Sequence, residues 1–350
     1  MDVKEIKLTV NSEESVLDLI RLVRPEWKSD DSLAIRVFQG GVANRLYGVL
    51  ADGNSVARTL LVRVFGEGSD LFIDRRKERE YIELLWRHGH AEPLCATFDN
   101  GFVYGYIVGR PLTVTSVRLP HVFPKIARQL AQLHSVPKPD GISNPEPAIL
   151  RNLVDWLDLV PETFSKADVH QRVDAILPSR SVLKAEVKAL VDRLQSLNSP
   201  VVFGHNDTTP GNILELDDNP DQVAFIDHEY AGWNYRCFEL GNMFCEYCGV
   251  ERMDFSLFPS RAEQESFLQV YSTEAAALQS KGDHAVATLY NEASLGALAS
   301  NLQWTIWGLV QAEHSLIEFD YVDYAGTRLA EYHRQKALLG LNDSMNGTTR

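Results

Sequence analysis

The chain has 350 residues, of which 45% are hydrophobic and 23% charged, and its formal net charge is −14 at pH 7. The length and the apolar content suit a globular protein of one large or two packed domains. The negative charge argues against a nucleic-acid surface, because phosphate contacts need clustered Lys and Arg, and it weakly favours a cationic ligand.

No segment predicts export or membrane insertion. The first residues, MDVKEIKLTVNSEESVLDLI, mix charges throughout and lack the apolar core of a signal peptide. Residues 293–312 carry no charge over a membrane-spanning length, but interspersed Ser, Asn and Gln favour a buried helix. Four cysteines suit a reducing compartment, so we expect a cytoplasmic protein. Cys245 and Cys248 have no second pair nearby, which favours buried side chains on one helical turn over a metal site.

The chain from about residue 33 to 108 has the pattern of a small sheet. The segments LAIRVFQG, RLYGVLAD and SVARTLLVRVFG predict strands, with Asp52-Gly53-Asn54 as a hairpin turn between the second and third. DRRKEREYIELLWRHG has apolar residues at helical spacing, and LCATFDNGFVYGYIVG predicts two more strands. We therefore expect a sheet that carries one helix.

Beyond this sheet the pattern becomes mainly helical. HVFPKIARQLAQLHS is amphipathic, and so are the stretches near 149–159 and 181–197, while the proline-rich segment 136–148 predicts a surface loop. Short strands are expected at 201–204 and 222–227.

Together these elements predict an α+β fold of two lobes, the layout of protein kinases. The first lobe, residues 1–108, is small and β-rich, and the second, residues 109–350, is larger and mainly helical.

Residues 201–230 hold a spacing that predicts phosphoryl transfer. Asp207 stands five residues before Asn212, and Asp227 ends an apolar run. Protein kinases use Asp-x-x-x-x-Asn followed by a metal-binding Asp, so that one carboxylate meets the hydroxyl while the other groups hold Mg²⁺. We expect Asp207 as the catalytic base and Asn212 and Asp227 as metal ligands. An Asp that merely caps the turn is the alternative, and His205 is expected to bond the loop backbone.

Several longer motifs resemble the choline/ethanolamine kinase family. They are HNDTTPGNIL, IDHEYAGWNYRCFELGN, WTIWGLVQAEHSLIEFDYVDYA and, near the start, GGVANRLYGV, within roughly residues 33–335. The segment 245–260 is more similar to the ethanolamine kinase branch. The resemblance implies ATP- and Mg²⁺-dependent phosphorylation of ethanolamine to phosphoethanolamine, the first step of the CDP-ethanolamine route to phosphatidylethanolamine. It implies a small-molecule substrate and no membrane insertion, and leaves a homodimer open.

In the first lobe the resemblance implies a nucleotide site. The loop from Gly40 to Asn44 would bring backbone N–H groups to phosphates, although Ala43 replaces the family's usual hydroxyl residue. Arg63 matches the phosphate-pairing cation of the third strand, and Glu78 would orient it as in a kinase Lys–Glu pair. The alternative for the glycine loop is an ordinary hairpin. The alternative for Arg63 and Glu78 is a pair of solvent-facing charges without a role in binding. The expected cofactor-binding residues are Gly40, Gly41, Asn44, Arg63, Glu78, Tyr104, Tyr106 and Ile107, the last three around adenine.

Three residues of the second lobe depart from the family or have two interpretations. Glu229 is a further metal ligand or a surface ion-pair partner. His228 stands where the family usually has an aromatic residue. Glu239 replaces the Asp of the family's F-D-x-G-N run, and its extra methylene predicts looser support of the catalytic loop.

The substrate end is expected on a helix near residues 295–311. One of its faces is a Leu/Ile stripe, whereas the opposite face mixes Trp304 and Trp307 with polar groups, which suits a pocket wall. The resemblance puts Trp304, Trp307 and Tyr324 around the substrate's ammonium, which aromatic faces attract. The alternative is that the two tryptophans are buried in a helix interface and contribute only packing.

The choice between ethanolamine and choline depends on acceptors for the ammonium. A carboxylate such as Glu246 favours the smaller cation with N–H donors, so ethanolamine is expected first and choline as a poorer substrate. A choline or dual kinase, another small-molecule kinase of the same fold and a pseudokinase scaffold remain as alternatives. The expected substrate-binding residues are Asp207, Glu246, Trp304, Trp307 and Tyr324.

Overall fold

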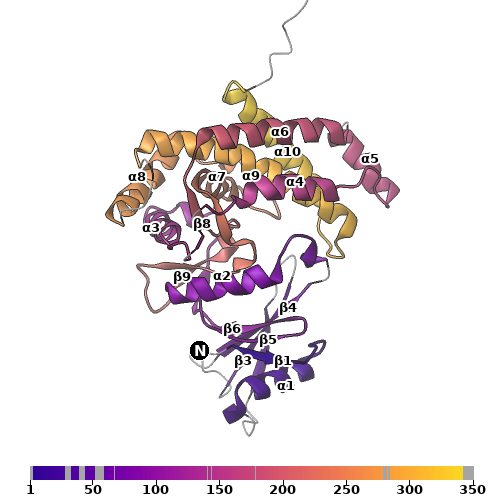
Figure 1. Cartoon of the computed structure of the whole chain (residues 1–350), viewed down its shortest axis with the longest axis vertical. Coiled ribbons are helices and arrows are strands. Elements are labelled where there is room, and N and C mark those ends of the chain that lie inside the picture. The colour runs from indigo at the N-terminus through magenta and orange to yellow at the C-terminus, as the bar shows by residue number, and fades with distance from the viewer. Residues whose placement is uncertain are drawn as a thin grey trace, which may run out of the picture. The chain divides into compact units, whose positions relative to one another are not determined.

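The computed structural model describes residues 3–27, 33–38, 44–51, 59–66, 68–139, 141–142, 144–177, 179–278, 282 and 284–341. The chain divides into two compact units, which we call unit 1 and unit 2. Unit 1 comprises Met1–Pro111 with Ile213–Tyr230, and unit 2 comprises Leu112–Asn212 with Ala231–Arg350. Strands predominate in unit 1 and helices in unit 2 (Figure 1). The expected domain boundary between residues 108 and 109 stays a prediction.

Unit 1 is built on a six-stranded sheet with the strand order β1-β5-β6-β4-β3-β2. The β1–β5 pair is parallel, and the other neighbouring strands are antiparallel. The five strands expected from the sequence are confirmed as β2 to β6, whereas β1 was not expected. The bounds are β1 Lys4–Ile6, β2 Ala34–Phe38, β3 Asn44–Leu50, β4 Thr59–Phe65, β5 Leu94–Phe98 and β6 Gly101–Gly105.

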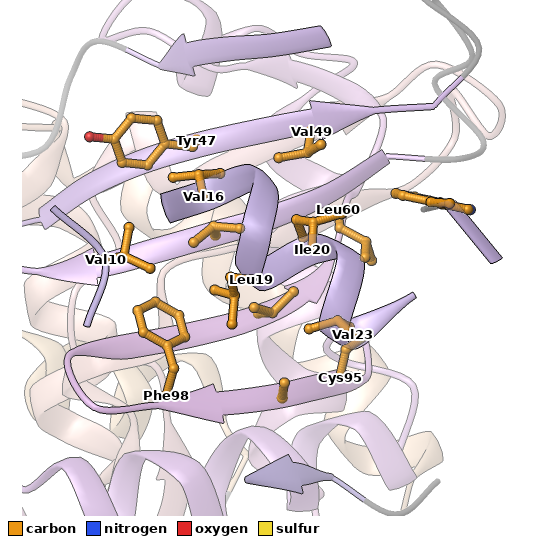
Figure 2. Packing of buried hydrophobic residues seen from close by; sticks show 14 of the residues in the cluster. Val10, Val16, Leu19, Ile20, Val23, Tyr47, Val49, Leu60, Cys95 and Phe98 are labelled. Carbon is orange, nitrogen blue, oxygen red and sulfur yellow. The ribbon is translucent and has the colours of Figure 1, made fainter. Parts of the chain in front are cut away.

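Helices pack on both faces of this sheet. Successive side chains of a strand point to opposite faces, so each face offers apolar residues to a helix. Helix α1 (Glu13–Val23), which begins at a Ser12 capping box, packs Val16, Leu19 and Ile20 against buried residues that include Leu60 of β4 (Figure 2). Val62 of β4 belongs to the same cluster. Val62 is adjacent to Arg63, so Arg63 points to the opposite face. Helix α1 lies before the range 33–108, for which one helix was expected, and it was not predicted, although its apolar residues recur at helical spacing.

The opposite face of the sheet carries the expected helix, α2 (Arg75–Arg87). Asp74 caps it by accepting the N–H groups of Arg76 and Lys77, and Ile82 packs with Phe102 of β6. Phe102 is the cross-strand partner of Arg63, which places Arg63 on the α2 side.

A small antiparallel sheet completes unit 1. Its strand order is β10-β9-β7, with β7 at Gly109–Pro111, β9 at Ile213–Leu216 and β10 at Val223–Phe225. The strand expected at 222–227 is β10, and Asp227 follows its end. A 3-10 turn at His228–Tyr230 comes next.

Unit 2 is mainly helical, with one two-stranded antiparallel sheet of β8 and β11. The helices expected near 121–135, 149–159 and 181–197 and the strand at 201–204 are confirmed. Among the helices that the structure describes, none is long and apolar enough to cross a membrane. The bounds are α3 Phe123–His134, α4 Ala148–Leu159, α5 Ala167–Ile176, α6 Arg180–Leu197, β8 Val201–Gly204, β11 Gly232–Tyr235, α7 Arg236–Glu246, α8 Arg261–Ala277, α9 Val286–His314 and α10 Tyr321–Leu338.

Helices α7 and α9 cross in direct backbone contact. A Cβ atom on Gly241 would lie 2.1 Å from the backbone nitrogen of Ala297, and one on Gly296 would lie 1.7 Å from the carbonyl oxygen of Cys237. Glycine is therefore required at both positions. Residues 296–311 of α9 are buried on every side, so the Leu/Ile stripe and the tryptophan face are both interior.

The expectation for the cysteine pair was partly wrong. Cys245 and Cys248 are both buried, as expected. However, α7 ends at Glu246, so Cys248 lies beyond the helix and the two residues do not share a helical turn.

Candidate functional site

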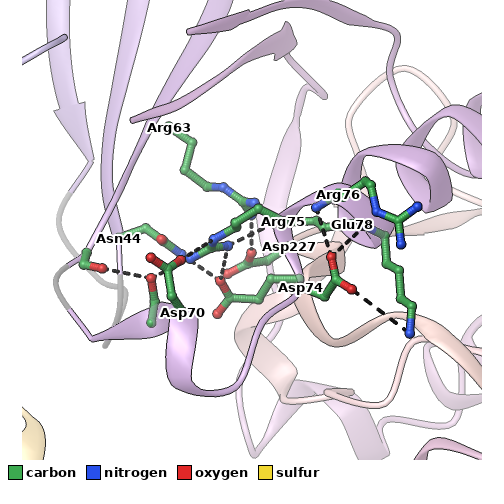
Figure 3. A network of polar contacts seen from close by, with 12 residues as sticks. Asn44, Arg63, Asp70, Asp74, Arg75, Arg76, Glu78 and Asp227 are labelled. Carbon is green, nitrogen blue, oxygen red and sulfur yellow. Dashed lines mark hydrogen bonds and ion pairs between the residues drawn. The ribbon is translucent and has the colours of Figure 1, made fainter. Parts of the chain in front are cut away.

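Unit 1 holds a group of polar side chains that we call the charged cluster: Asn44, Arg63, Arg75, Glu78, Asp227 and Glu229. At its centre Arg63 of β4 forms an ion pair with Glu78 of α2, and these side chains are 4% and 1% exposed. Nη1 of Arg63 also donates to Oδ1 of Asp227 at 2.9 Å (Figure 3). Burial by itself would lower the pKa of Arg63, but the neighbouring acidic groups raise it above its ordinary value. Arg63 is therefore held as a cation, and its own side chain is buried.

A second arginine, Arg75, was not expected from the sequence. Its Nη1 donates to Oε2 of Glu78 at 2.8 Å and lies 3.6 Å from Oε2 of Glu229. Its guanidinium carbon lies 4.1 Å from the centre of the Phe65 ring. Glu78 is thus held between two cations, one on each oxygen. The spacing of Arg75 and Glu78, three residues apart on one helix, was the available signal.

Asp227 and Glu229 supply two carboxylates to the charged cluster. Asp227 has a φ of 60°, a left-handed conformation that costs most residues other than glycine about 1–3 kcal/mol. Oε2 of Glu229 accepts a hydrogen bond from Nδ2 of Asn44 at 2.9 Å. Burial and the nearby charge of Asp227 raise the pKa of Glu229. A bound cation would relieve this repulsion, and oxygen ligands of this type suit Mg²⁺.

The remaining nucleotide-site predictions have different outcomes. Gly40 and Gly41, like the turn at Asp52-Gly53-Asn54, lie outside the described residues. Tyr104 acts electrostatically on Arg63, and its burial raises its pKa to about 12. Tyr106 stacks on Phe38 with ring centres 6.0 Å apart, and Ile107, which follows it, is half-buried. Among the described residues, no group of three or more His, Cys, Asp or Glu side chains could hold a metal ion.

In unit 2, Asp207 lies in the loop after β8. Nδ2 of Asn212 donates to Oδ2 of Asp207 at 2.9 Å and to its carbonyl oxygen at 3.1 Å. These bonds use the amide N–H groups of Asn212 and leave its Oδ1 outside them. The N–H of Asp207 donates to Nδ1 of His205 at 3.3 Å, which confirms the expected backbone bond of His205. The structure therefore pairs Asp207 with Asn212 and fixes the orientation of the carboxylate.

Asn242 links this loop to helix α9. Its Nδ2 donates to Oγ1 of Thr208, the residue after Asp207, at 3.2 Å. Its Oδ1 accepts from Oγ of Ser300 at 2.8 Å and from Nε1 of Trp304 at 2.9 Å. Asn242 is fully buried, so these bonds are made away from water. Sequence reasoning missed this role, because the partners lie far from Asn242 in the chain.

Trp304, Trp307 and Tyr324 form an aromatic cluster. The ring centre of Trp307 lies 5.7 Å from that of Trp304 and 5.8 Å from that of Tyr324. Burial raises the pKa of Tyr324; Arg328 opposes that shift, while Glu246 and Asp207 add to it. Of the five residues proposed for the substrate, the three aromatic ones are in ring contact, and Asp207 and Glu246 act electrostatically on Tyr324.

Glu246 is held by an arginine that the sequence did not reveal. Nη2 of Arg328 donates to Oε1 of Glu246 at 2.7 Å, and both side chains are buried. Oε2 of Glu246 has no hydrogen-bond partner among the described residues. A buried acceptor left in this state costs about 1–3 kcal/mol, so this oxygen favours a donor from a ligand.

Together the fold and these groups define a phosphotransferase with a protein-kinase-like arrangement. The chain belongs to the choline/ethanolamine kinase family, whose sequence model matches residues 35–333. It is 37% identical over 92% of its length to a probable ethanolamine kinase of Nematostella vectensis, covering 93% of that protein. It is also 41% identical to the ethanolamine kinase of Drosophila melanogaster, over 81% of this chain and 56% of that protein.

A solved structure confirms the expected α+β, protein-kinase-like fold. The Plasmodium vivax ethanolamine kinase superposes with a TM-score of 0.78 at 23% identity, over 93% of this chain and 89% of that one.

Proposed function

We propose that this chain is an ethanolamine kinase. It transfers the terminal phosphoryl group of ATP to the hydroxyl of ethanolamine and forms phosphoethanolamine, the first step of the CDP-ethanolamine route to phosphatidylethanolamine. The observation that carries the proposal is a set of contacts around one aromatic cluster. Asn242 bonds both Thr208, the residue after Asp207, and Trp304 of the cluster. Glu246 is paired with Arg328, whose guanidinium carbon lies 5.3 Å from the ring centre of Tyr324. A base for a hydroxyl and an acceptor for an ammonium stand around one aromatic cluster, which matches a small amino alcohol. The names of the relatives support the same substrate.

Asp207 orients the ethanolamine hydroxyl and accepts its proton as the new P–O bond forms. Asn212 keeps the carboxylate in place through the 2.9 Å bond to Oδ2. Such positioning suits phosphoryl transfer, in which the protein contributes geometry and charge rather than covalent chemistry. That Asn212 also binds metal through its Oδ1 stays a prediction from the sequence.

The charged cluster serves the nucleotide. Arg63 pairs with phosphate oxygens, and Glu78 keeps Arg63 extended across the sheet, as the kinase Lys–Glu pair does. Asp227 and Glu229 would hold Mg²⁺, which would neutralise charge on the phosphates. The remaining proposed nucleotide-binding residues are Gly40, Gly41, Asn44, Tyr104, Tyr106 and Ile107.

Ethanolamine is preferred because its ammonium carries N–H donors. The unpaired Oε2 of Glu246 accepts one of them, and Trp304, Trp307 and Tyr324 surround the charge. Choline is the second candidate, since the aromatic cluster attracts any ammonium, but its methyl groups give Glu246 no hydrogen bond. A cytoplasmic location, a homodimer and the absence of a nucleic-acid partner stay predictions from the sequence.

ATP turnover with a panel of amines tests the proposal. Ethanolamine should give the highest kcat/KM, and Asp207→Ala should lower kcat about 10²- to 10⁴-fold, the usual contribution of a general base. Comparable kcat/KM values for ethanolamine and choline would contradict the preference. Turnover without any amine, or an active Asp207→Ala, would contradict the mechanism, and nucleotide binding without turnover would indicate a pseudokinase.

A further inference from the structure

Glu239, in the first turn of α7, supports the loop that carries Asp207. The side chain is fully buried, and both of its oxygens accept the N–H of Asn206 at 3.1 Å. Asn206 directly precedes Asp207 and has a φ of 66°, the left-handed conformation that Asn tolerates better than most residues. The Glu239 carboxylate therefore fixes the backbone of Asn206, the residue just before Asp207.

Gly204, the last residue of β8, supplies the room that Glu239 occupies. A Cβ atom at Gly204 would lie 2.2 Å from Oε2 of Glu239 and 3.0 Å from Oδ1 of Asn206. Gly204 is not among the described glycines with positive φ, so its backbone conformation does not require glycine. Glycine at position 204 is instead explained by the space that the Glu239 carboxylate needs.

Other buried groups close the space around Glu239. Nε2 of His134 lies 3.9 Å from Oε2 of Glu239, and Nδ1 of His134 is hydrogen-bonded to the Tyr271 hydroxyl at 2.8 Å. Nδ2 of Asn234 donates to Oδ1 of Asn206 at 2.8 Å. Packed interiors yield little to added atoms, so a side chain at position 204 must displace the carboxylate or the loop.

We propose that Gly204 and Glu239 are a matched pair in which Glu239 is a positioning residue for Asp207. The inference rests on the proposed function, because it assigns Asp207 the role of the base. The extra methylene of Glu239 relative to Asp is taken up by the space at Gly204. An Asp at this position would fall short by about 1.5 Å, one C–C bond, and leave the N–H of Asn206 without its acceptor.

Glu239 variants measured at saturating ATP and ethanolamine test the positioning role. Glu239→Asp should lower kcat by about 10- to 100-fold, with both KM values within about twofold, because a small misplacement of a catalytic group affects the transition state. Glu239→Gln keeps the side-chain length and one carbonyl acceptor, so it should retain most of the kcat that Glu239→Asp loses. Glu265→Gln, which neutralises a half-buried glutamate of the same unit that forms an ion pair only with Arg261 among the described residues, should leave kcat unchanged. A Glu239→Asp enzyme with normal kcat, or with changes confined to KM, would overturn the role.

A double-mutant cycle tests the match. Gly204→Ala should lower kcat and the urea midpoint in the wild-type background and cost far less beside Glu239→Asp, where the added methyl group has room. Additive effects would overturn the pairing. If Gly204→Ala alone does not fold while Gly204→Ala/Glu239→Asp does, the pairing is supported, and if neither folds it is overturned. A wild-type protein without ethanolamine turnover refutes the proposed function instead, while the urea cycle still decides the pairing.

Discussion

The charged cluster of unit 1 and the loop around Asp207 in unit 2 are held together by different forces. The first joins two arginines to three carboxylates. The second depends on directional hydrogen bonds. Asn242 bonds Thr208, Ser300 and Trp304, and the Glu239 carboxylate accepts the N–H of Asn206. Charges interact over several ångströms and in many geometries, whereas hydrogen bonds weaken steeply when they are misaligned.

This difference suits the two tasks proposed for these regions. The proposed site for phosphates and a metal would have to exchange its internal ion pairs for contacts with a charged ligand, which long-range forces allow. A catalytic base must stay in one orientation, which directional bonds enforce. Each region also contains a residue other than glycine in the left-handed conformation, Asp227 in the first and Asn206 in the second. Strain of this kind persists where the surrounding structure over-determines it, as functional sites often do.

The largest expected effect breaks the charged cluster. Glu78→Gln removes the charge that both Arg63 and Arg75 contact, so it should lower the free energy of unfolding by about 3–5 kcal/mol, the usual cost of stranding a buried charge. ATP affinity, measured by calorimetry at a temperature where the variant is folded, should fall as well.

Glu80→Gln is the matched control on the same helix. Glu80 is 57% exposed and lies 3.5 Å from Arg76, so its loss should change the unfolding free energy by less than about 1 kcal/mol in urea titrations. Equal changes in unfolding free energy for the two variants would show that the buried ion pairs of Glu78 stabilise the protein no more than an exposed pair does.

A smaller effect is expected where packing rather than charge fixes the site. Gly296→Ala forces α9 away from α7, since the new methyl group would overlap the carbonyl oxygen of Cys237. We expect a loss of about 1–3 kcal/mol in unfolding free energy and a higher KM for ethanolamine with an unchanged KM for ATP.

Gly326→Ala in α10 serves as the comparison. Its Cβ would meet the side chain of Ile176 at 3.3 Å, and alanine favours a helix over glycine by about 1 kcal/mol. This variant should be close to neutral. A Gly296→Ala protein as stable as Gly326→Ala would mean that the helices do not need to touch.

Local patterns could be predicted from the sequence, and contacts between distant segments could not. The spacing of Asp207, Asn212 and Asp227 pointed to one reaction because the three residues lie in a single stretch. Arg63 and Glu78 were paired through the family resemblance, and the structure shows them in contact. Their catalytic and cofactor roles stay predictions.

Arg328 and Asn242, unlike Arg75, were missed because their partners lie far away in the chain. Arg328 contacts Glu246 from another helix, and Asn242 reaches Trp304 across the crossing of α7 and α9. The spacing of residues along the sequence does not predict contacts between helices that are so far apart in the chain. Glu239 was noticed as a departure from its family, but its fit could not be understood until Gly204 was seen beside it.

The smallest expected effect separates the aromatic contribution from the carboxylate contribution within the proposed substrate site. Trp307→Leu keeps an apolar side chain but removes an aromatic face, and such faces contribute about 0.5–2 kcal/mol to binding a cation. For ethanolamine, kcat/KM should therefore fall by about 2- to 30-fold, and the loss is limited because Glu246 still accepts its N–H groups. Choline has no such donor and should lose more, so the ratio of the two kcat/KM values should shift further toward ethanolamine. The KM for ATP serves as the internal control and should not change. Equal losses for both amines would contradict the division of work between the aromatic cluster and Glu246, and would indicate that Trp307 contributes packing alone.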